Sequence, residues 1–482
     1  MNEALTASRR RGHRPVLASA RLRHAAGRFL SVAAALAVLS SHPAYAQQAG
    51  GGPKLNIIRD AEIEELLRDY TRPILRVAKL GGQNIEVVII GDRAFNAFVA
   101  DGRRIFVNIG ALYEAETPNQ IIGVLAHETG HIAGGHLARM RDQIANAQTA
   151  SIVAMLMAAA GMAAGAATNA QGLGQAMPGL VLGPQEMIRR SLLGYARQQE
   201  EAADRAAVNF LNATGQSAKG MLQTFQRFAD QTMFISRSVD PYTLSHPMPR
   251  DRIAQLEHIA RASPNFNRAD PPALQFRHEM MRAKIAGFVD RPEAVLRRYP
   301  PSNASLPARY ARAISSYRFG DVRSAVAQVD ALIAEQPSNP YFHELKGQAF
   351  LESGRAREAV APLRRAVQLS NGSGLIRMML GQALVQSGDK SLANEATAVL
   401  RQALAQEPNA PLGYRQLAIA LGRQGDRANA DLASAQASFN EGDFATAKQL
   451  AARAQRGLPK GSPGWLKADD IVNYKPAQIR QN

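Results

Sequence analysis

Apolar side chains recur at helical spacing just beyond residue 55 and at strand spacing soon after. The first set predicts an amphipathic helix and comprises Ile58, Ile63, Leu66, Leu67, Ile74 and Leu75. Residues 85–90 are then rich in β-branched side chains and residues 104–109 alternate, which predicts two strands separated by a Gly-Asp turn. The second strand can lie inside a small mixed sheet or pair with an extended substrate.

Helical spacing returns after Thr117-Pro118 and predicts a helix from Asn119 to about Met140. Further helices are predicted over 185–213, with Gly215 as the stop, and over 220–232, 252–260 and 275–289. The first half of the chain is therefore expected to form a small α+β domain.

The C-terminal half carries an internal repeat. Gly320, Gly354 and Gly388 lie 34 residues apart, and Gly425 follows after 37. A small residue stands seven positions before each glycine and an alanine five positions after it, which is the tetratricopeptide signature of paired antiparallel helices. The predicted fold class is mainly α, with a small α+β domain followed by an α-solenoid. Such repeats generally expose a concave face that binds partners, although helical hairpins can also serve structure alone.

Positive charge is concentrated at the N-terminus. Residues 1–46 hold seven arginines against Glu3 alone, so they supply +6 of the net charge of +17. A basic region, an apolar run over 29–39 and Ala44-Tyr45-Ala46 together predict a cleavable secretory signal. An uncleaved membrane anchor is the alternative, although the run is short for a span. The chain is therefore expected to be exported, either as a free protein or peripheral to a membrane.

Two absences narrow the function. The chain has no cysteine, which excludes disulfides and cysteine ligands. It has no basic patch interleaved with aromatic residues, so nucleic acid is not an expected partner.

Residues 151–184 carry no charge and are dominated by Ala, Gly and Met. This segment is interpreted as a lid or a loop in peripheral contact with a membrane, or as a buried helical hairpin.

His127-Glu128-Thr129-Gly130-His131 is an HExxH motif within an apolar helical stretch. Residues four apart on a helix share a face, so both imidazoles can bind one Zn²⁺ while Glu128 lies beside the open coordination position. There Glu128 can accept a proton from an activated water and return it to the leaving amine. The motif predicts one Zn²⁺ per chain and a peptidase.

A catalytic zinc needs a third protein ligand, and two candidates compete. His136 would reach the metal only if Gly134-Gly135 ends the helix, and the metzincin pattern places its histidine one position later, at Leu137. His136 is therefore interpreted as a supporting residue beside the ligands. Glu200 shares a helix face with Asp204, which can accept the N–H of a ligating histidine. Geometry alone leaves this acidic cluster open between a zinc-facing side and a solvated one.

Ser245-His246-Pro247 lies in a predicted loop. The imidazole of His246 can donate to the oxyanion of a tetrahedral intermediate, or occupy the open zinc position and keep the enzyme latent. A loop histidine without a partner is the third interpretation.

HExxH, then Tyr195-Ala196-Arg197-Gln198-Gln199-Glu200-x-x-Ala203-Asp204, then Ser245-His246-Pro247 resembles the gluzincin metallopeptidases related to HtpX and the CAAX prenyl endopeptidase. With the signal and the repeats, the chain is similar to their periplasmic subgroup of β-barrel assembly-enhancing proteases. Ala196 departs from the pattern, because relatives often carry a hydroxyl residue there. The resemblance implies a gluzincin fold, zinc bound by His127, His131 and Glu200, Glu128 as general base, and Asp204 supporting a ligand.

The resemblance also implies an endopeptidase that acts on misfolded or stalled envelope proteins, with repeats that dock on the outer-membrane β-barrel assembly machinery. The alternative is a chaperone or scaffold that acts mainly through its repeats while the metal site stays latent. The expected divisions are a signal peptide (1–46), a linker (47–54), a zinc metallopeptidase domain (55–270), connecting helices (271–305), a repeat domain (306–460) and a tail (461–482).

Overall fold

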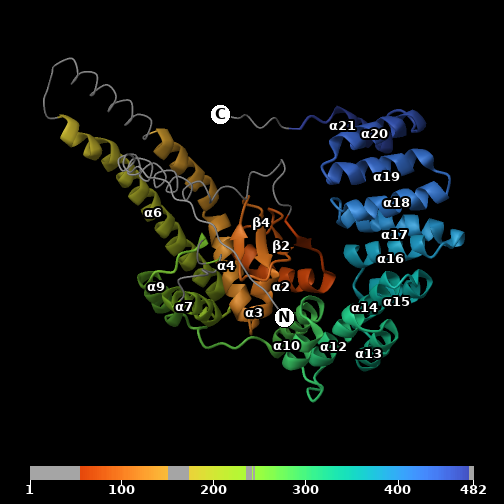
Figure 1. Cartoon of the computed structure of the whole chain (residues 1–482), viewed down its shortest axis with the longest axis horizontal. Coiled ribbons are helices and arrows are strands. Elements are labelled where there is room, and N and C mark those ends of the chain that lie inside the picture. Colours follow the sequence, from red (N-terminus) through yellow and green to blue (C-terminus); the bar gives the residue numbers. More distant parts are fainter. Residues whose placement is uncertain (1–54, 150–172, 235–241, 243–244, 477–482) are drawn as a thin grey trace, which may run out of the picture. The chain divides into compact units, whose positions relative to one another are not determined.

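The computed structural model describes residues 55–149, 173–234, 242 and 245–476 (Figure 1). The predicted signal peptide, the linker and residues 151–172 of the uncharged segment lie outside these ranges, so the interpretations placed on them stay predictions. Within the described ranges, no helix combines the length and the apolar character needed to cross a bilayer.

A four-stranded mixed sheet forms one layer of the N-terminal domain. Its order is β1-β2-β4-β3, from β1 (Ile57–Ile58), β2 (Glu86–Ile90), β3 (Ala97–Val99) and β4 (Arg104–Asn108). The two predicted strands are present as β2 and β4, but the prediction that a Gly-Asp turn separates them was wrong, because they run parallel and β3 lies in the connection between them. Since β4 pairs with β2 on one side and β3 on the other, pairing of a substrate along 104–109 is also wrong.

Helices α2 (Ala61–Val77), α3 (Ile109–Glu114) and α4 (Pro118–Ala133) contact the sheet, and further helices join them around one core that includes Leu67, Ile89 and Leu125. Helix α2 begins where the Asp60 side chain accepts the N–H of Ile63. The further helices are α6 (Leu173–Ala213), α7 (Lys219–Phe234), α9 (Arg250–Arg261) and α10 (Pro272–Val289).

Helix α4 ends earlier than the sequence pattern predicts. It stops at Ala133, and a turn at Gly134-Gly135 precedes a second helical stretch over 136–149. Gly135 has a φ of 62°, which glycine adopts without strain. A Cβ on Gly134 would lie 2.2 Å from Nε2 of His136. Both glycines are therefore needed to fold His136 back beside the end of α4.

Two glycines let α4 approach its neighbours closely. A Cβ on Gly130 would lie 2.9 Å from the carbonyl oxygen of Ala203 on α6, and one on Gly123 would lie 2.4 Å from Cβ of Met221 on α7. Interiors are packed too densely to absorb such contacts without movement. The HExxH helix and the helix that carries Glu200 are thus held side by side, as Figure 1 shows for α4 and α6.

The C-terminal half is the predicted stack of paired helices. Gly354, Gly388 and Gly425 have φ values of 77°, 74° and 84° in the turns between the helices of a pair. A Cβ on Gly347 would lie 2.4 Å from Leu363, which explains the small residue of the signature. The elements are α11 (Pro292–Arg298), α12 (Leu306–Phe319), α13 (Val322–Glu335), α14 (Pro340–Glu352), α15 (Ala356–Leu369), α16 (Gly374–Gln386), η1 (Lys390–Leu392), α17 (Ala393–Gln406), α18 (Pro411–Arg423), α19 (Arg427–Asn440), α20 (Phe444–Gly457) and α21 (Pro463–Asn473).

A buried charge cluster joins the start of α2 to the first repeats. It consists of Asp60 and Glu62 from the α2 end, Lys284 from α10, Tyr310 from α12 and Glu344 from α14. The ammonium of Lys284 lies 2.8 Å from Oδ2 of Asp60 and 3.2 Å from Oε2 of Glu62, and the Tyr310 hydroxyl donates to Glu62 over 3.0 Å. Asp60 and Glu62 thus share one ammonium, whose charge also acts on the buried carboxyl group of Glu344. Burial is the main cause that raises the pKa of Glu344 to about 8. The negative charges of Asp60 and Glu62 also raise this pKa, and the positive charge of Lys284 offsets only part of the increase.

We predict that Glu344→Gln changes the pH dependence of folding stability. Because the folded pKa of Glu344 lies above its unfolded value, the folded state binds an extra proton, and wild-type stability falls as pH rises from about 5 to 8. The melting temperature of the variant, minus that of the wild type, should therefore rise by a few degrees over that range. Glu358→Gln, at an exposed glutamate on α15, is the control. Parallel melting curves for Glu344→Gln and the wild type would contradict the prediction.

Candidate metal centre

The HExxH residues lie near the C-terminal end of α4. His127 and Glu128 are fully buried, and His131 lies one turn further on the same face. Nε2 of His127 and Nε2 of His131 are 3.1 Å apart. Two imidazole nitrogens at this distance can both bind one metal ion.

Glu200 brings a carboxylate from α6 to the same point. Its Oε2 lies 3.3 Å from Nε2 of His127, and its Oε1 lies 3.4 Å from Nε2 of His131. Bonds of about 2.0 to 2.1 Å in a tetrahedral zinc site place neighbouring donor atoms roughly 3.3 Å apart. The observed separations therefore suit a single ion held by all three side chains.

His246 supplies a fourth donor. Its Nδ1 lies 3.0 Å from Oε2 of Glu200 and 3.4 Å from Nε2 of His127. Ligand atoms from His127, His131, Glu200 and His246 all lie within 4.8 Å of one another, and we refer to these four residues as the donor set. Three imidazoles with one carboxylate are typical zinc ligands, whereas Mg²⁺ and Ca²⁺ favour oxygen atoms.

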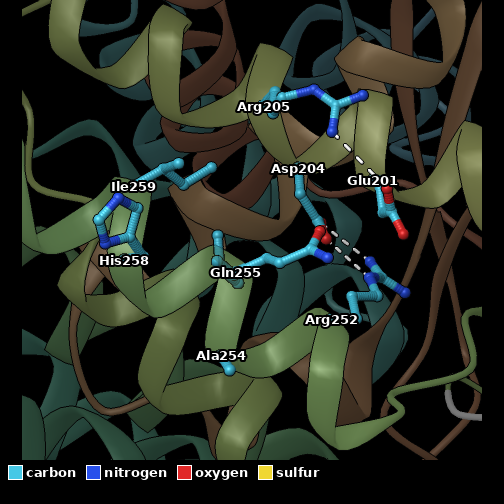
Figure 2. Close-up of a pocket in the computed structure, with 9 residues that line it drawn as sticks. Glu201, Asp204, Arg205, Arg252, Ala254, Gln255, His258 and Ile259 are labelled. Atoms are coloured by element: carbon cyan, nitrogen blue, oxygen red, sulfur yellow. Dashed lines mark hydrogen bonds and ion pairs between the residues drawn. The ribbon is translucent and has the colours of Figure 1, made fainter.

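Asp204 and Arg252 support the donor set from the side of α6 and α9. Oδ1 of Asp204 lies 2.9 Å from Nδ1 of His127, the ring nitrogen that does not face Glu200. Arg252 donates to both oxygens of Asp204, over 2.6 Å from Nε and 2.9 Å from Nη2 (Figure 2). A pocket of about 390 Å³ between α6 and α9 is lined by Asp204 and Arg252 and by none of the donor set.

The two α6 carboxylates are held in their charged forms. Burial acts to raise the pKa of Glu200, but His246 and His127 bring it well below its usual value. Burial likewise acts to raise the pKa of Asp204, but Arg252 and His127 lower it to about 2. Both groups are therefore ionised at neutral pH, as metal binding and histidine orientation require.

The carboxylate of Glu128 lies in the site without a hydrogen bond to any described residue. Both of its carboxylate oxygens are buried and have no hydrogen-bond partner in the described part of the chain. Its Oε1 lies 3.4 Å from Nε2 of His246, and burial raises its pKa. Since buried polar atoms are normally hydrogen-bonded, Glu128 is placed to receive a small polar group beside the donor set. The residues present thus fit a catalytic divalent ion.

His136, the competing candidate for the third ligand, lies outside the donor set, as does Glu201, which follows Glu200 in the sequence. Nδ1 of His136 lies 3.0 Å from Nδ1 of His131, on the side away from the donor atoms, so His136 contacts a candidate ligand rather than the ion position. Glu201 lies 3.7 Å from Arg205 on the surface of α6. The structure therefore brings Glu200 to the two HExxH histidines and leaves His136 beside them.

Sequence reasoning missed Arg252 and Tyr242. The sequence pattern marks Arg252 only as the start of a helix. Two acids on a buried helix face nevertheless predict a buried cation close to them. The ring of Tyr242 is buried against His246, with ring centroids 4.7 Å apart. Tyr242 is helical in the structure, and no sequence pattern around it predicted a place beside His246.

Comparison with known proteins agrees with this fold. Residues 58–260 match peptidase family M48, and residues 310–374 match the tetratricopeptide repeat. The chain thus combines a metallopeptidase domain of family M48 with a tetratricopeptide repeat domain.

The similar curated proteins share one description. A putative β-barrel assembly-enhancing protease of Vibrio cholerae is 28% identical over 59% of this chain and 58% of its own length. The β-barrel assembly-enhancing proteases of Escherichia coli K12 and Yersinia pestis are 25% and 24% identical, each over 62% of this chain and 60% of its own length. The chain thus matches less than two thirds of each relative. Among solved structures, MamA covers 33% of this chain at 19% identity and a TM-score of 0.27, which is too low to support an argument.

Proposed function

We propose that this protein is a zinc-dependent endopeptidase that cleaves misfolded or stalled proteins of the bacterial envelope. The observation that carries the proposal is the donor set, which places His127, His131 and Glu200 around one point with the buried Glu128 beside it. The family match over residues 58–260 supports a peptidase. One zinc ion per chain is proposed as the cofactor.

Each residue of the site has a distinct task in this proposal. His127, His131 and Glu200 would hold zinc, which supplies Lewis acidity and makes water a competent nucleophile at neutral pH. Glu128 accepts the proton of the attacking water at its unpartnered carboxylate and delivers it to the leaving amine. Oδ1 of Asp204 lies 2.9 Å from Nδ1 of His127, where it would accept the Nδ1–H and so fix the tautomer that leaves Nε2 free.

His246 is proposed to hold the enzyme latent. A catalytic zinc site keeps one coordination position open, whereas here Nδ1 of His246 lies among the other donors, 3.0 Å from Glu200. Its Nε2 also lies 3.4 Å from Glu128, so the same ring covers the base. A histidine that acts only on the oxyanion would need a substrate carbonyl between itself and the metal. The donor geometry therefore favours the latent role over the catalytic one.

The substrate class and the cellular location are proposed from the edge of the sheet, the names of the relatives and the sequence. The outer edge of β3, which ends the sheet order and packs against α4, suits pairing with an extended peptide. The names of the relatives support a role in outer-membrane β-barrel assembly, with the repeats docking on the assembly machinery and on unfolded chains. The predicted signal supports a periplasmic location, and the uncharged segment 151–184 supports peripheral membrane contact.

A second candidate function is a chaperone or scaffold whose metal site remains closed. The specific observation in its favour is that all four donor residues already converge, which leaves no open position. Chaperone activity through the repeats is compatible with both candidates, so the two differ in whether peptide bonds are cut.

We predict that Glu128→Gln abolishes hydrolysis of an unfolded substrate such as casein, by at least 100-fold, because the amide cannot accept the proton. Zinc content, measured by mass spectrometry of the purified protein, should stay at one ion per chain, since Glu128 is not a ligand. Glu116→Gln, at an exposed glutamate before α4, is the matched control and should cleave normally. Wild-type cleavage by the Glu128 variant would refute the peptidase assignment.

We predict that His246→Ala raises the rate of casein hydrolysis several-fold, because the position beside Glu128 becomes open to water and substrate. Initial rates at equal zinc loading measure the effect. His258→Ala, at a histidine on α9 outside the donor set, controls for loss of an imidazole. A lower rate in the His246 variant would instead assign His246 to the oxyanion, and an unchanged rate would discard both roles.

A further inference from the structure

Arg252 contacts several residues of the site, and no sequence pattern predicted these contacts. Its side chain is 4% exposed, and its guanidinium lies over the ring of Phe225, 5.5 Å from the ring centroid. Besides its two hydrogen bonds to Asp204, its Nη1 lies 3.0 Å from Oε2 of Glu200 and donates to the carbonyl oxygen of Pro247 over 2.9 Å. One planar group thus touches a candidate ligand, the residue that supports His127, and the backbone of the His246 loop.

Charge balance explains why a cation is needed at this point. Glu200 and Asp204 are both buried, and the guanidinium of Arg252 lies 3.0 Å from the first carboxylate and 2.6 Å from the second. Removing the partner of a buried charge is strongly destabilising, because the remaining charge keeps its desolvation cost without compensation. Arginine suits the position because its fork can meet both oxygens of Asp204 while Nη1 remains for Glu200; a lysine ammonium is a single point charge. Figure 2 shows the guanidinium facing the carboxylate of Asp204.

The contact with Pro247 adds a second role. Pro247 follows His246 directly, so a hydrogen bond to its carbonyl fixes the backbone that positions the His246 ring. The same nitrogen, Nη1, contacts Glu200. Through this shared nitrogen, the loop that carries the fourth donor and the helix that carries the third are joined by one side chain.

We propose that Arg252 is a positioning residue that couples the His246 loop to Glu200 and Asp204, so that closure of the site by His246 depends on the guanidinium. The proposal rests on the zinc site of the proposed function. Arg252 does not touch the ion position. It acts by holding Glu200 in its ligating orientation and by anchoring the loop that presents His246.

A double-mutant cycle between Arg252 and His246 tests the coupling. Zinc affinity is measured by competition with a chromogenic chelator for the wild type, Arg252→Lys, His246→Ala and the double variant. Arg252→Lys should weaken zinc binding about 10- to 100-fold, in the range found for residues that support metal ligands. In the Arg252→Lys background, His246→Ala should cost at least threefold less affinity than in the wild type, because the loop is already released. Arg261→Lys, at an exposed arginine on α9, is the control.

Two results would overturn the proposal: Arg252→Lys binding zinc as the wild type does, or the two fold-changes multiplying in the double variant. Failure of the zinc site itself appears separately, as a wild-type protein that binds no zinc.

The metal-free protein gives an independent readout that stands if Arg252→Lys folds poorly. Arg252→Gln should lower the melting temperature of the metal-free protein by several degrees, because two buried carboxylates lose their partner. Adding Asp204→Asn should restore part of that loss, since one of the uncompensated charges is removed. A double variant that melts lower than Arg252→Gln would contradict the charge-balance argument.

Discussion

The convergence of buried donor atoms is the constraint on which the rest of the N-terminal domain depends. Nitrogen and oxygen atoms of the donor set lie within 4.8 Å of one another in a site largely closed to water, where their lone pairs face each other. Without a cation such an arrangement is costly, because imidazole lone pairs that face each other do not satisfy one another. A divalent ion removes that cost, so folding of this region and metal binding are expected to be linked.

Several features of the fold serve this constraint. Gly130 lets the HExxH helix approach α6 closely enough for the Glu200 carboxylate to reach both imidazoles. Arg252 neutralises the charge that two acids on one helix face would otherwise bring into the interior. His246 joins the other members of the donor set from outside α4 and α6. The proposed ligands on the two helices and the proposed fourth donor are therefore carried by different parts of the chain.

Local patterns predicted much of this arrangement, and long-range pairing accounts for what they left out. The four-residue spacing of His127 and His131, and of Glu200 and Asp204, is a property of a helix, so it could be read directly. Three features came instead from contacts between distant residues: the parallel pairing of β2 with β4, the contact of Arg252 with α6, and the cluster around Lys284. The early end of α4 was a local signal, but periodicity alone continued the helix through Gly134-Gly135.

We propose above all that Glu200, rather than His136, is the third protein ligand that binds one zinc ion together with the two HExxH histidines. It is tested most directly by the zinc affinity of Glu200→Gln, His136→Gln and Glu201→Gln, each measured by chelator competition against the wild type. The account predicts a loss of at least two orders of magnitude for Glu200→Gln, a loss of no more than about tenfold for His136→Gln, as for a residue that only supports a ligand, and wild-type binding for Glu201→Gln. Zinc binding that survives Glu200→Gln but is lost in His136→Gln would contradict it.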